Sequence, residues 1–178
     1  MVKYQVTEEK RFMINLGILT ISDKGWRGER DDKSGQAIKE SLSRLNSSLL
    51  KYEVIPDEAG AIAAKLAEWA DEGSLDIILT TGGTGLSERD VTPEATLSIL
   101  DKIVPGLAEA MRAKTAEVTP FAVLSRAVAG LRKKCLIINL PGSTRAVTEC
   151  LEVILPVIPH ALEIIKGEVT EHITPGKG

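Results

Sequence analysis

A glycine-rich turn follows the apolar run Leu75–Thr81 directly. Glycines let the backbone adopt positive φ and bring bare N–H groups close to a ligand. Such N–H groups form a nest for an anion, and a helix predicted to begin near Thr92 adds partial positive charge. The turn therefore predicts a phosphate site, although a tight turn without a ligand is the structural alternative. It is neither a Walker A loop nor a dinucleotide fingerprint, because the spacing of its residues fits neither. The candidate phosphate-binding residues are Thr81, Gly82, Gly83, Thr84 and Gly85.

Two aspartates are candidates for a magnesium site beside this turn. Asp90 lies five residues after Gly85, and Asp57 follows the predicted strand Lys51–Ile55. Mg²⁺ usually takes one or two protein carboxylates together with substrate oxygens and water. Asp57 and Asp90 are therefore the predicted Mg²⁺ ligands. A surface salt bridge for Asp90 and a helix N-cap for Asp57 are the alternatives.

The elements that must position these residues alternate between strands and helices. Apolar runs predict strands at Ile14–Ile21, Lys51–Ile55 and Leu75–Thr81, and a hairpin of Ala127–Leu131 with Leu136–Leu140. Helical spacing predicts helices near 38–45, at 62–69 with Gly73 after it, from Thr92 to about Lys102, at Leu107–Ala116, and from Val147 to Ile165. In the last of these, Pro156 and Pro159 should kink or break the helix. The segment Asp23–Lys33 is predicted to be a loop.

Strands that are apolar throughout indicate a mainly parallel sheet that is covered on both faces. The sequence therefore predicts a single three-layer α/β domain with helices on both faces and a small antiparallel hairpin. In such sheets the ligand crevice lies beyond the carboxyl ends of the strands, where the strand order reverses. Four turns that follow predicted strands should therefore meet at one rim. They are Ser22-Asp23, Pro56-Asp57, the glycine-rich turn and Pro141-Gly142.

Two groups of cationic residues follow these elements along the chain. Arg126, which comes directly after Ser125, could pair with a phosphate or a carboxylate. The run Arg132-Lys133-Lys134 is interpreted as a solvated hairpin turn.

Composition limits the classes of function. The chain has 178 residues, 43% hydrophobic and 26% charged, which suits one soluble domain. A net charge of −3 and only 3% aromatic residues argue against nucleic-acid binding. No apolar run approaches the ~20 residues that span a bilayer, and the charged N-terminus lacks a signal-peptide core. Two cysteines without metal-ligand spacing predict neither a disulfide framework nor a zinc site. The expected compartment is the cytoplasm.

Several blocks of sequence resemble the molybdenum-cofactor biosynthesis family. The main block is Ile78–Gly85, followed after four residues by Asp90–Thr96. The chain looks most similar to bacterial molybdopterin adenylyltransferases of the MogA/MoaB type and to the G domain of gephyrin. The resemblance covers about 16–167, and the further matching blocks are Leu19–Asp23, Ile55–Asp57, Leu124–Arg126 and Ile138–Ser143.

The resemblance implies adenylyl transfer from Mg-ATP to molybdopterin, which releases pyrophosphate. It implies that Asp57 and Asp90 are the essential carboxylates and that the turn Gly82–Gly85 binds the phosphates. The nucleotide and pterin pockets are then lined by Ser22, Asp23, Ser125, Pro141 and Gly142. The resemblance further implies a homotrimer and the molybdenum-insertion enzyme as a partner. The implied domain spans 14–167, between an N-terminal extension (1–13) and a C-terminal tail (168–178).

The sequence also allows other functions. A non-catalytic pterin-binding or assembly protein of the same family is the main alternative, although both aspartates are present. The molybdenum-insertion enzyme itself is much longer than this chain. A generic phosphosugar-binding or nucleotide-binding domain would not explain the matching blocks. The loop Lys24–Arg30 departs from the family pattern.

Overall fold

The apolar residues of β1 (Ile14–Ile21) face two separate helix layers. In the computed structural model, which describes residues 12–168, Leu16 and Ile18 join one hydrophobic cluster, while Leu19 and Ile21 join another. Successive side chains of a strand point to opposite faces of a sheet. A strand that is apolar on both faces must therefore lie in the middle of three layers, as the continuous runs predict.

One sheet of six strands forms within the described residues. Its order is β2-β1-β3-β6-β5-β4. The strands β2, β1, β3 and β6 are parallel to one another, whereas β5 is antiparallel to both β6 and β4. The further strands are β2 (Ser47–Ile55), β3 (Ile77–Thr81), β4 (Lys102–Ile103), β5 (Ala129–Arg132) and β6 (Cys135–Leu140).

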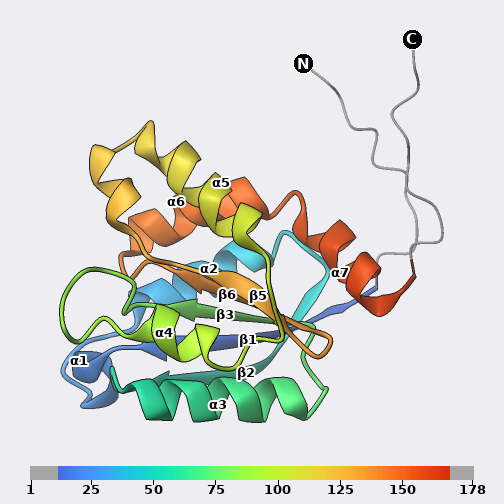
Figure 1. The fold of residues 1–178 in the computed structure, drawn as a ribbon, viewed down its shortest axis with the longest axis horizontal. Coiled ribbons are helices and arrows are strands. Elements are labelled where there is room, and N and C mark those ends of the chain that lie inside the picture. Colours follow the sequence, from blue (N-terminus) through green and yellow to red (C-terminus); the bar gives the residue numbers. More distant parts are fainter. Residues whose placement is uncertain (1–11, 169–178) are drawn as a thin grey trace.

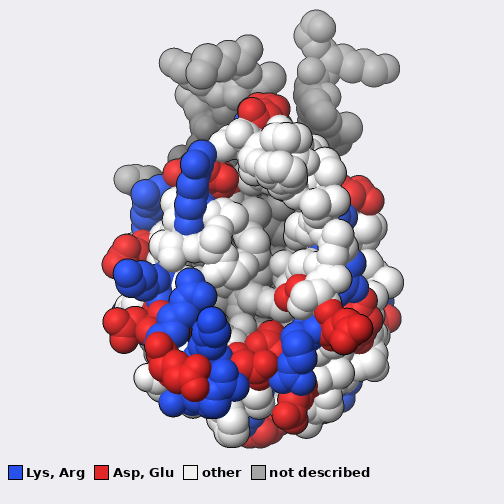
Figure 2. Space-filling view, turned by 90° about the vertical axis from the view of Figure 1, so that its left-hand side faces the viewer, with Lys and Arg blue, Asp and Glu red and all other residues white. Residues whose placement is uncertain are grey.

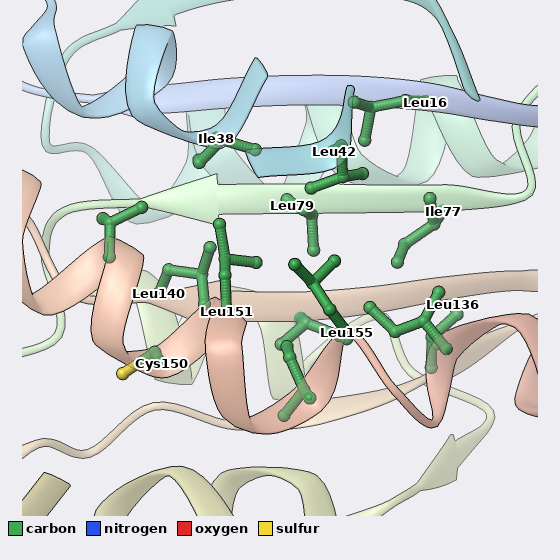
Figure 3. Packing of buried hydrophobic residues seen from close by; sticks show 14 of the residues in the cluster. Leu16, Ile38, Leu42, Ile77, Leu79, Leu136, Leu140, Cys150, Leu151 and Leu155 are labelled. Atoms are coloured by element: carbon green, nitrogen blue, oxygen red, sulfur yellow. The ribbon is translucent and has the colours of Figure 1, made fainter. Parts of the chain in front are cut away.

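Helices cover both faces of this sheet (Figure 1). On one face lie α2 (Lys33–Leu42), α5 (Pro105–Ala116), α6 (Thr144–Ile154) and α7 (Ile158–Lys166). On the other lie α3 (Ala59–Asp71) and α4 (Thr92–Leu97). Figure 3 shows Ile38 and Leu42 of α2 and Leu151 of α6 packed over the sheet residues Leu79 and Leu140.

Much of the predicted order of elements is confirmed. The strand Ile14–Ile21, the β5–β6 hairpin and the three-layer arrangement appear as expected. Gly73 follows α3 with a φ of 75°, which suits a glycine that ends a helix. The prolines at 156 and 159 divide the last predicted helix into α6 and α7, and Pro159 lies in the first turn of α7.

Other predictions were wrong in local detail. The segment Asp23–Lys33 contains the short helix α1 (Asp23–Trp26), which Ser22 caps by accepting a hydrogen bond from the Gly25 N–H at 3.1 Å. Several other elements begin at a residue different from the predicted one. β2 begins at 47 and not at 51, β3 at 77 and not at 75, and α5 at 105 and not at 107.

The helix that was predicted from Thr92 to about Lys102 ends at Leu97, because Lys102 and Ile103 pair with β5 as β4. The N-cap of α4 is Val91, and the hydroxyl of Thr92 donates to the Gly82 carbonyl oxygen in the preceding turn. The 3₁₀ helix η1 (Pro120–Leu124) was not predicted at all.

Two predictions fall largely outside the described residues. They concern the N-terminal extension (1–13) and the tail (168–178), of which only residues 12, 13 and 168 are described. Between residues 12 and 168, no helix is long and apolar enough to cross a membrane.

Candidate functional site

The glycine-rich turn lies where the strand order reverses. β1 is flanked by β2 on one side and β3 on the other, so a crevice is expected beyond the carboxyl ends of β1 and β3. Gly82 leaves β3 at this point with a φ of 98°, and its N–H donates to the Leu140 carbonyl oxygen at 3.2 Å. A Cβ at Gly82 would lie 2.2 Å from the Ile21 carbonyl oxygen. Only glycine lets the turn pass this close to β1.

Hydrogen bonds tie the turn to its neighbours. The Thr92 hydroxyl donates to the Gly82 carbonyl oxygen at 2.9 Å, and the Thr92 N–H donates to that of Gly83 at 3.1 Å. The Thr81 hydroxyl donates to the carbonyl oxygen of Pro141 at 2.7 Å. The turn is thus held between α4 and the segment after β6, which leaves its shape largely independent of any ligand.

Asp23 and Asp57 bind each other's backbone. The Asp23 N–H donates to Asp57 Oδ2 at 2.8 Å, and the Asp57 N–H donates to Asp23 Oδ1 at 3.1 Å. Arg89 holds Asp23 with Nη2–O distances of 2.8 and 2.9 Å. The hydrogen bond from Arg89, followed by that from the Asp57 N–H, lowers the pKa of Asp23.

Asp57 has the opposite shift. Its burial raises the pKa of the carboxyl above the usual range, and the charges of Asp23 and Asp90 add to the rise. Asp57 Oδ1 would lie 3.4 Å from a Cβ at Gly83, so the carboxylate faces the turn closely. A bound cation would reduce the repulsion that Asp23 and Asp90 add to the effect of burial on Asp57.

Asp90 approaches the turn from its other end. Its Oδ2 accepts the Ser87 N–H at 2.9 Å and would lie 2.9 Å from a Cβ at Gly85. Within residues 12–168, no group of three or more His, Cys, Asp or Glu is arranged to hold a metal ion. Two carboxylates whose charges interact fit Mg²⁺ that takes its other ligands from substrate and water.

The larger cavity beside the turn has a volume of about 420 Å³. Figure 2 looks onto this face, where uncharged surface surrounds a hollow above a band of charged side chains. Apolar side chains of α5, η1 and α6 make up most of its wall, and the glycine-rich turn forms part of its edge. It is lined by Gly83, Thr84, Gly85, Asp90, Ala108, Met111, Arg112, Thr115, Thr119, Phe121, Ala122, Leu124, Ser125, Ala127, Pro141, Gly142, Ser143, Ala146, Glu149 and Cys150.

A smaller cavity of about 160 Å³ lies on the other side of the turn. Its lining mixes polar and apolar surface, and it includes two carboxylates as well as two cations, Arg30 and Lys33, whose side chains have no ion-pair partner within the described part of the chain. The remaining lining residues are Thr20, Ile21, Ser22, Gly25, Asp31, Asp32, Ser34, Thr81, Gly82, Gly142 and Thr144. Gly142 lines both cavities, so the two adjoin.

Sequence reasoning missed Asp32, which supports the smaller cavity. Burial alone would raise the pKa of Asp32, but hydrogen bonds outweigh it and the pKa is lowered. The donors are the Gly35 N–H and the hydroxyls of Thr20, Tyr52 and Ser34. Asp32 also caps α2. An aspartate three residues before a glycine at a helix start is the signal that could have found it.

The structure gathers the predicted site residues at the two cavities. Ser22, Thr81 and Gly82 line the smaller one, and Gly83, Thr84, Gly85, Asp90, Ser125 and Pro141 line the larger one. Asp23 and Asp57 line neither cavity but lie beside the turn. Arg126 is bonded to the protein itself, and the hairpin Arg132–Lys134 is at the opposite end of the sheet, where Arg132 pairs with Asp71.

Comparisons with known proteins agree with this geometry. Residues 17–160 match the family model described as a probable molybdopterin binding domain. The chain is 44% identical over 156 residues to a molybdopterin adenylyltransferase of Helicobacter pylori, covering 86% of this chain and 89% of the relative. It is 37% identical over 172 residues to the molybdopterin adenylyltransferase of Escherichia coli, covering 89% and 88%.

Solved structures show the same relation. The crystal structure of the molybdopterin biosynthesis enzyme MoaB from Thermus thermophilus superposes with a TM-score of 0.82 at 53% identity, over 86% of this chain and 97% of that one. The family match extends over most of the chain, and the fold, the glycine-rich turn and the carboxylates lie within it. The chain therefore belongs to the molybdopterin-binding family of molybdenum-cofactor biosynthesis proteins.

Proposed function

We propose that this protein transfers the adenylyl group of Mg-ATP to the phosphate of molybdopterin. The observation that carries the proposal is the pair of adjoining cavities that share Gly142 and differ in chemistry. The larger, with its apolar walls, suits a flat heterocycle. The smaller, with Arg30 and Lys33, suits phosphate groups. Relatives that are 37–44% identical over most of the chain are named molybdopterin adenylyltransferase.

The reaction needs two substrates to meet at one place. An oxygen of the molybdopterin phosphate attacks the α-phosphorus of ATP, the bond from that phosphorus to the bridging oxygen breaks, and pyrophosphate leaves. Such chemistry asks the protein for positioning and for neutralisation of charge. The backbone N–H groups of Gly83, Thr84 and Gly85 and the two cations of the smaller cavity offer both; the Gly82 N–H is already taken by the Leu140 carbonyl oxygen.

Asp57 and Asp90 are proposed to hold Mg²⁺. The ion, when bound, would neutralise phosphate charge and polarise the phosphorus. Asp57 must be ionised for this role; its burial raises the pKa of the carboxyl, and the charges of Asp23 and Asp90 raise it further. Ser22, Asp23, Thr81, Ser125, Pro141 and Gly142 are proposed to line the nucleotide and pterin sites.

The homotrimer is a further proposal, and it rests on exposed apolar side chains around η1. Val118, Phe121 and Val123 are 52%, 74% and 62% exposed in the single chain. A cluster of this kind marks an interaction surface. Sedimentation equilibrium should give three times 19.2 kDa. The molybdenum-insertion enzyme, which would consume the adenylylated product, and a cytoplasmic location are proposed from the family alone.

An adenylylation assay tests the function. The purified protein is incubated with molybdopterin, ATP and Mg²⁺, and adenylylated pterin is followed by chromatography. Asp57→Asn and Asp90→Asn should fold but form product at least ~100-fold more slowly. Asp101→Asn is a matched control, because Asp101 accepts the N–H of Lys133 at the opposite end of the sheet. Its variant should keep wild-type activity.

The alternative of a pterin-binding or assembly protein makes a different prediction. Wild-type protein that binds molybdopterin but forms no product with any divalent metal would refute adenylyl transfer and support that alternative. Loss of activity in Asp101→Asn equal to that in the other variants would refute the assigned roles of Asp57 and Asp90.

A further inference from the structure

We propose that Arg126 is a positioning residue that holds the segment Gly85–Asp90 in place, and that it is not a phosphate ligand. The proposal rests on the proposed function for its kinetic test alone. Of the two partners that the sequence allows for Arg126, a phosphate or a carboxylate, the structure shows a carboxylate, that of Glu94.

The contacts of Arg126 are all with the protein. Its backbone N–H donates to the Thr84 carbonyl oxygen at 2.9 Å, and Nε donates to that of Gly85 at 2.7 Å. Nη2 donates to the carbonyl oxygen of Asp90, and Nη1 pairs with the carboxylate of Glu94. Each guanidinium nitrogen is therefore engaged within the described structure. The guanidinium bridges both ends of the segment from Gly85 to Asp90.

Apart from Arg126, the segment is tied to the rest of the protein by Arg89, whose side chain pairs with Asp23. Residues 86–89 are exposed, and Leu86 is 66% accessible to solvent. Exposed segments with few apolar contacts open easily unless hydrogen bonds restrain them. Within the segment, Ser87 and Asp90 exchange two hydrogen bonds, at 2.9 and 3.0 Å. The link from Arg126 to the Asp90 carbonyl oxygen therefore helps to place the Asp90 carboxylate at the larger cavity.

Arg126 is itself anchored by a second arginine. Arg112 of α5 donates from Nη1 to the carbonyl oxygens of Ser125 and Ala127, at 3.3 and 2.8 Å. These carbonyls stand on either side of Arg126 in the chain. A continuous set of hydrogen bonds thus runs from α5 through Ser125–Ala127 to the glycine-rich turn and to Asp90.

Arg126→Lys tests this directly, because lysine keeps the charge but cannot reach three separate acceptors from one nitrogen. Arg132→Lys is a matched control. Arg132 pairs with Asp71 through two nitrogens and donates to the Ile99 carbonyl oxygen, far from the cavities. Hydrogen exchange measured by NMR should show the amides of Ser87 and Asp90 exchanging at least ~10-fold faster in Arg126→Lys and unchanged in Arg132→Lys.

Kinetics distinguish positioning from ligand binding. We expect Arg126→Lys to lower kcat about 10- to 100-fold, because small misplacement is costly in phosphoryl transfer, while the KM for ATP changes less than about threefold. Glu94→Gln, which removes one acceptor charge only, should give a smaller effect in the same direction. This second variant keeps the test decisive where Arg126→Lys fails to fold.

Three results would overturn the proposal. They are unchanged amide exchange in Arg126→Lys, faster exchange of the same amides in Arg132→Lys, and a raised KM for ATP with kcat preserved. If the proposed function is wrong, the wild-type protein forms no adenylylated product. The hydrogen-exchange measurement does not depend on that activity, so it still decides whether Arg126 holds the segment.

Discussion

Replacing Gly82 by alanine should destabilise the protein through the backbone alone. The φ of Gly82 is 98°, a region that residues with a Cβ rarely occupy. The added Cβ would also lie 2.2 Å from the Ile21 carbonyl oxygen. This oxygen belongs to a central strand, so it cannot move aside without disturbing the sheet.

The magnitude follows from these two causes. A strained backbone conformation costs about 1–3 kcal/mol, and an overpacked contact costs about 1–3 kcal/mol more. The free energy of unfolding should therefore fall by about 4 kcal/mol. For a chain of this size that corresponds to a Tm lower by about 8–16 °C. Gly142→Ala is the comparison, because its Cβ would meet Gly82 Cα at an ordinary 3.4 Å and its φ is not positive. Its stability should change by less than about 1 kcal/mol.

Urea unfolding followed by circular dichroism, together with thermal melting, measures both variants. The reasoning would be refuted by a Tm for Gly82→Ala within 2 °C of wild type, or by a larger loss in Gly142→Ala than in Gly82→Ala. Either result would mean that the turn relaxes freely, and that a rigid nest of N–H groups is not what the glycines provide.

The remaining predictions concern three other places. Thr96→Val should lower the free energy of unfolding, measured in urea, by about 1–3 kcal/mol. The fully buried Asn139 amide donates to the Thr96 hydroxyl at 3.0 Å and would lose that partner. Thr96→Ser should leave the free energy of unfolding nearly unchanged. The charge of Arg89 lowers the pKa of Asp57. Arg89→Gln should therefore raise that pKa and shift the acid limb of the pH profile of kcat/KM to higher pH. An acid limb at the same pH as in wild type would contradict the proposal that Asp57 acts in its ionised form. Cys150 has a pKa raised to about 11 by burial, so at pH 8 only about 10⁻³ of it is thiolate, and native protein should react with a thiol reagent far more slowly than unfolded protein.

How well the sequence predicted an element depended on how much of its pattern was local. Ile14–Ile21 was predicted to the residue, because seven of its eight residues are buried and most of them are apolar. β4 was missed, because Lys102 and Ile103 are exposed and become a strand only by pairing with β5. α1 was missed because four residues, one of them a glycine, carry no helical period.

The residue types of the candidate site were visible in the sequence, whereas their partners were not. Asp57 was chosen because it follows a strand, but its burial and its reciprocal bonds with Asp23 needed the fold. A guanidinium binds phosphates and carbonyl oxygens alike. The residues around Arg126 in the sequence therefore could not show that its side chain donates to the carbonyl oxygen of Gly85, 41 residues away.

The sequence by itself determined the three-layer sheet, the glycine-rich turn and the family, because apolar runs, glycine positions and ordered blocks of residues are local patterns. The tertiary structure decided where the cavities lie, how Asp57 is shifted and what Arg126 binds. These depend on distances between segments far apart in the chain. Electrostatic and hydrogen-bond energies vary steeply with such distances, and only the packing of β1, β3 and β6 sets them.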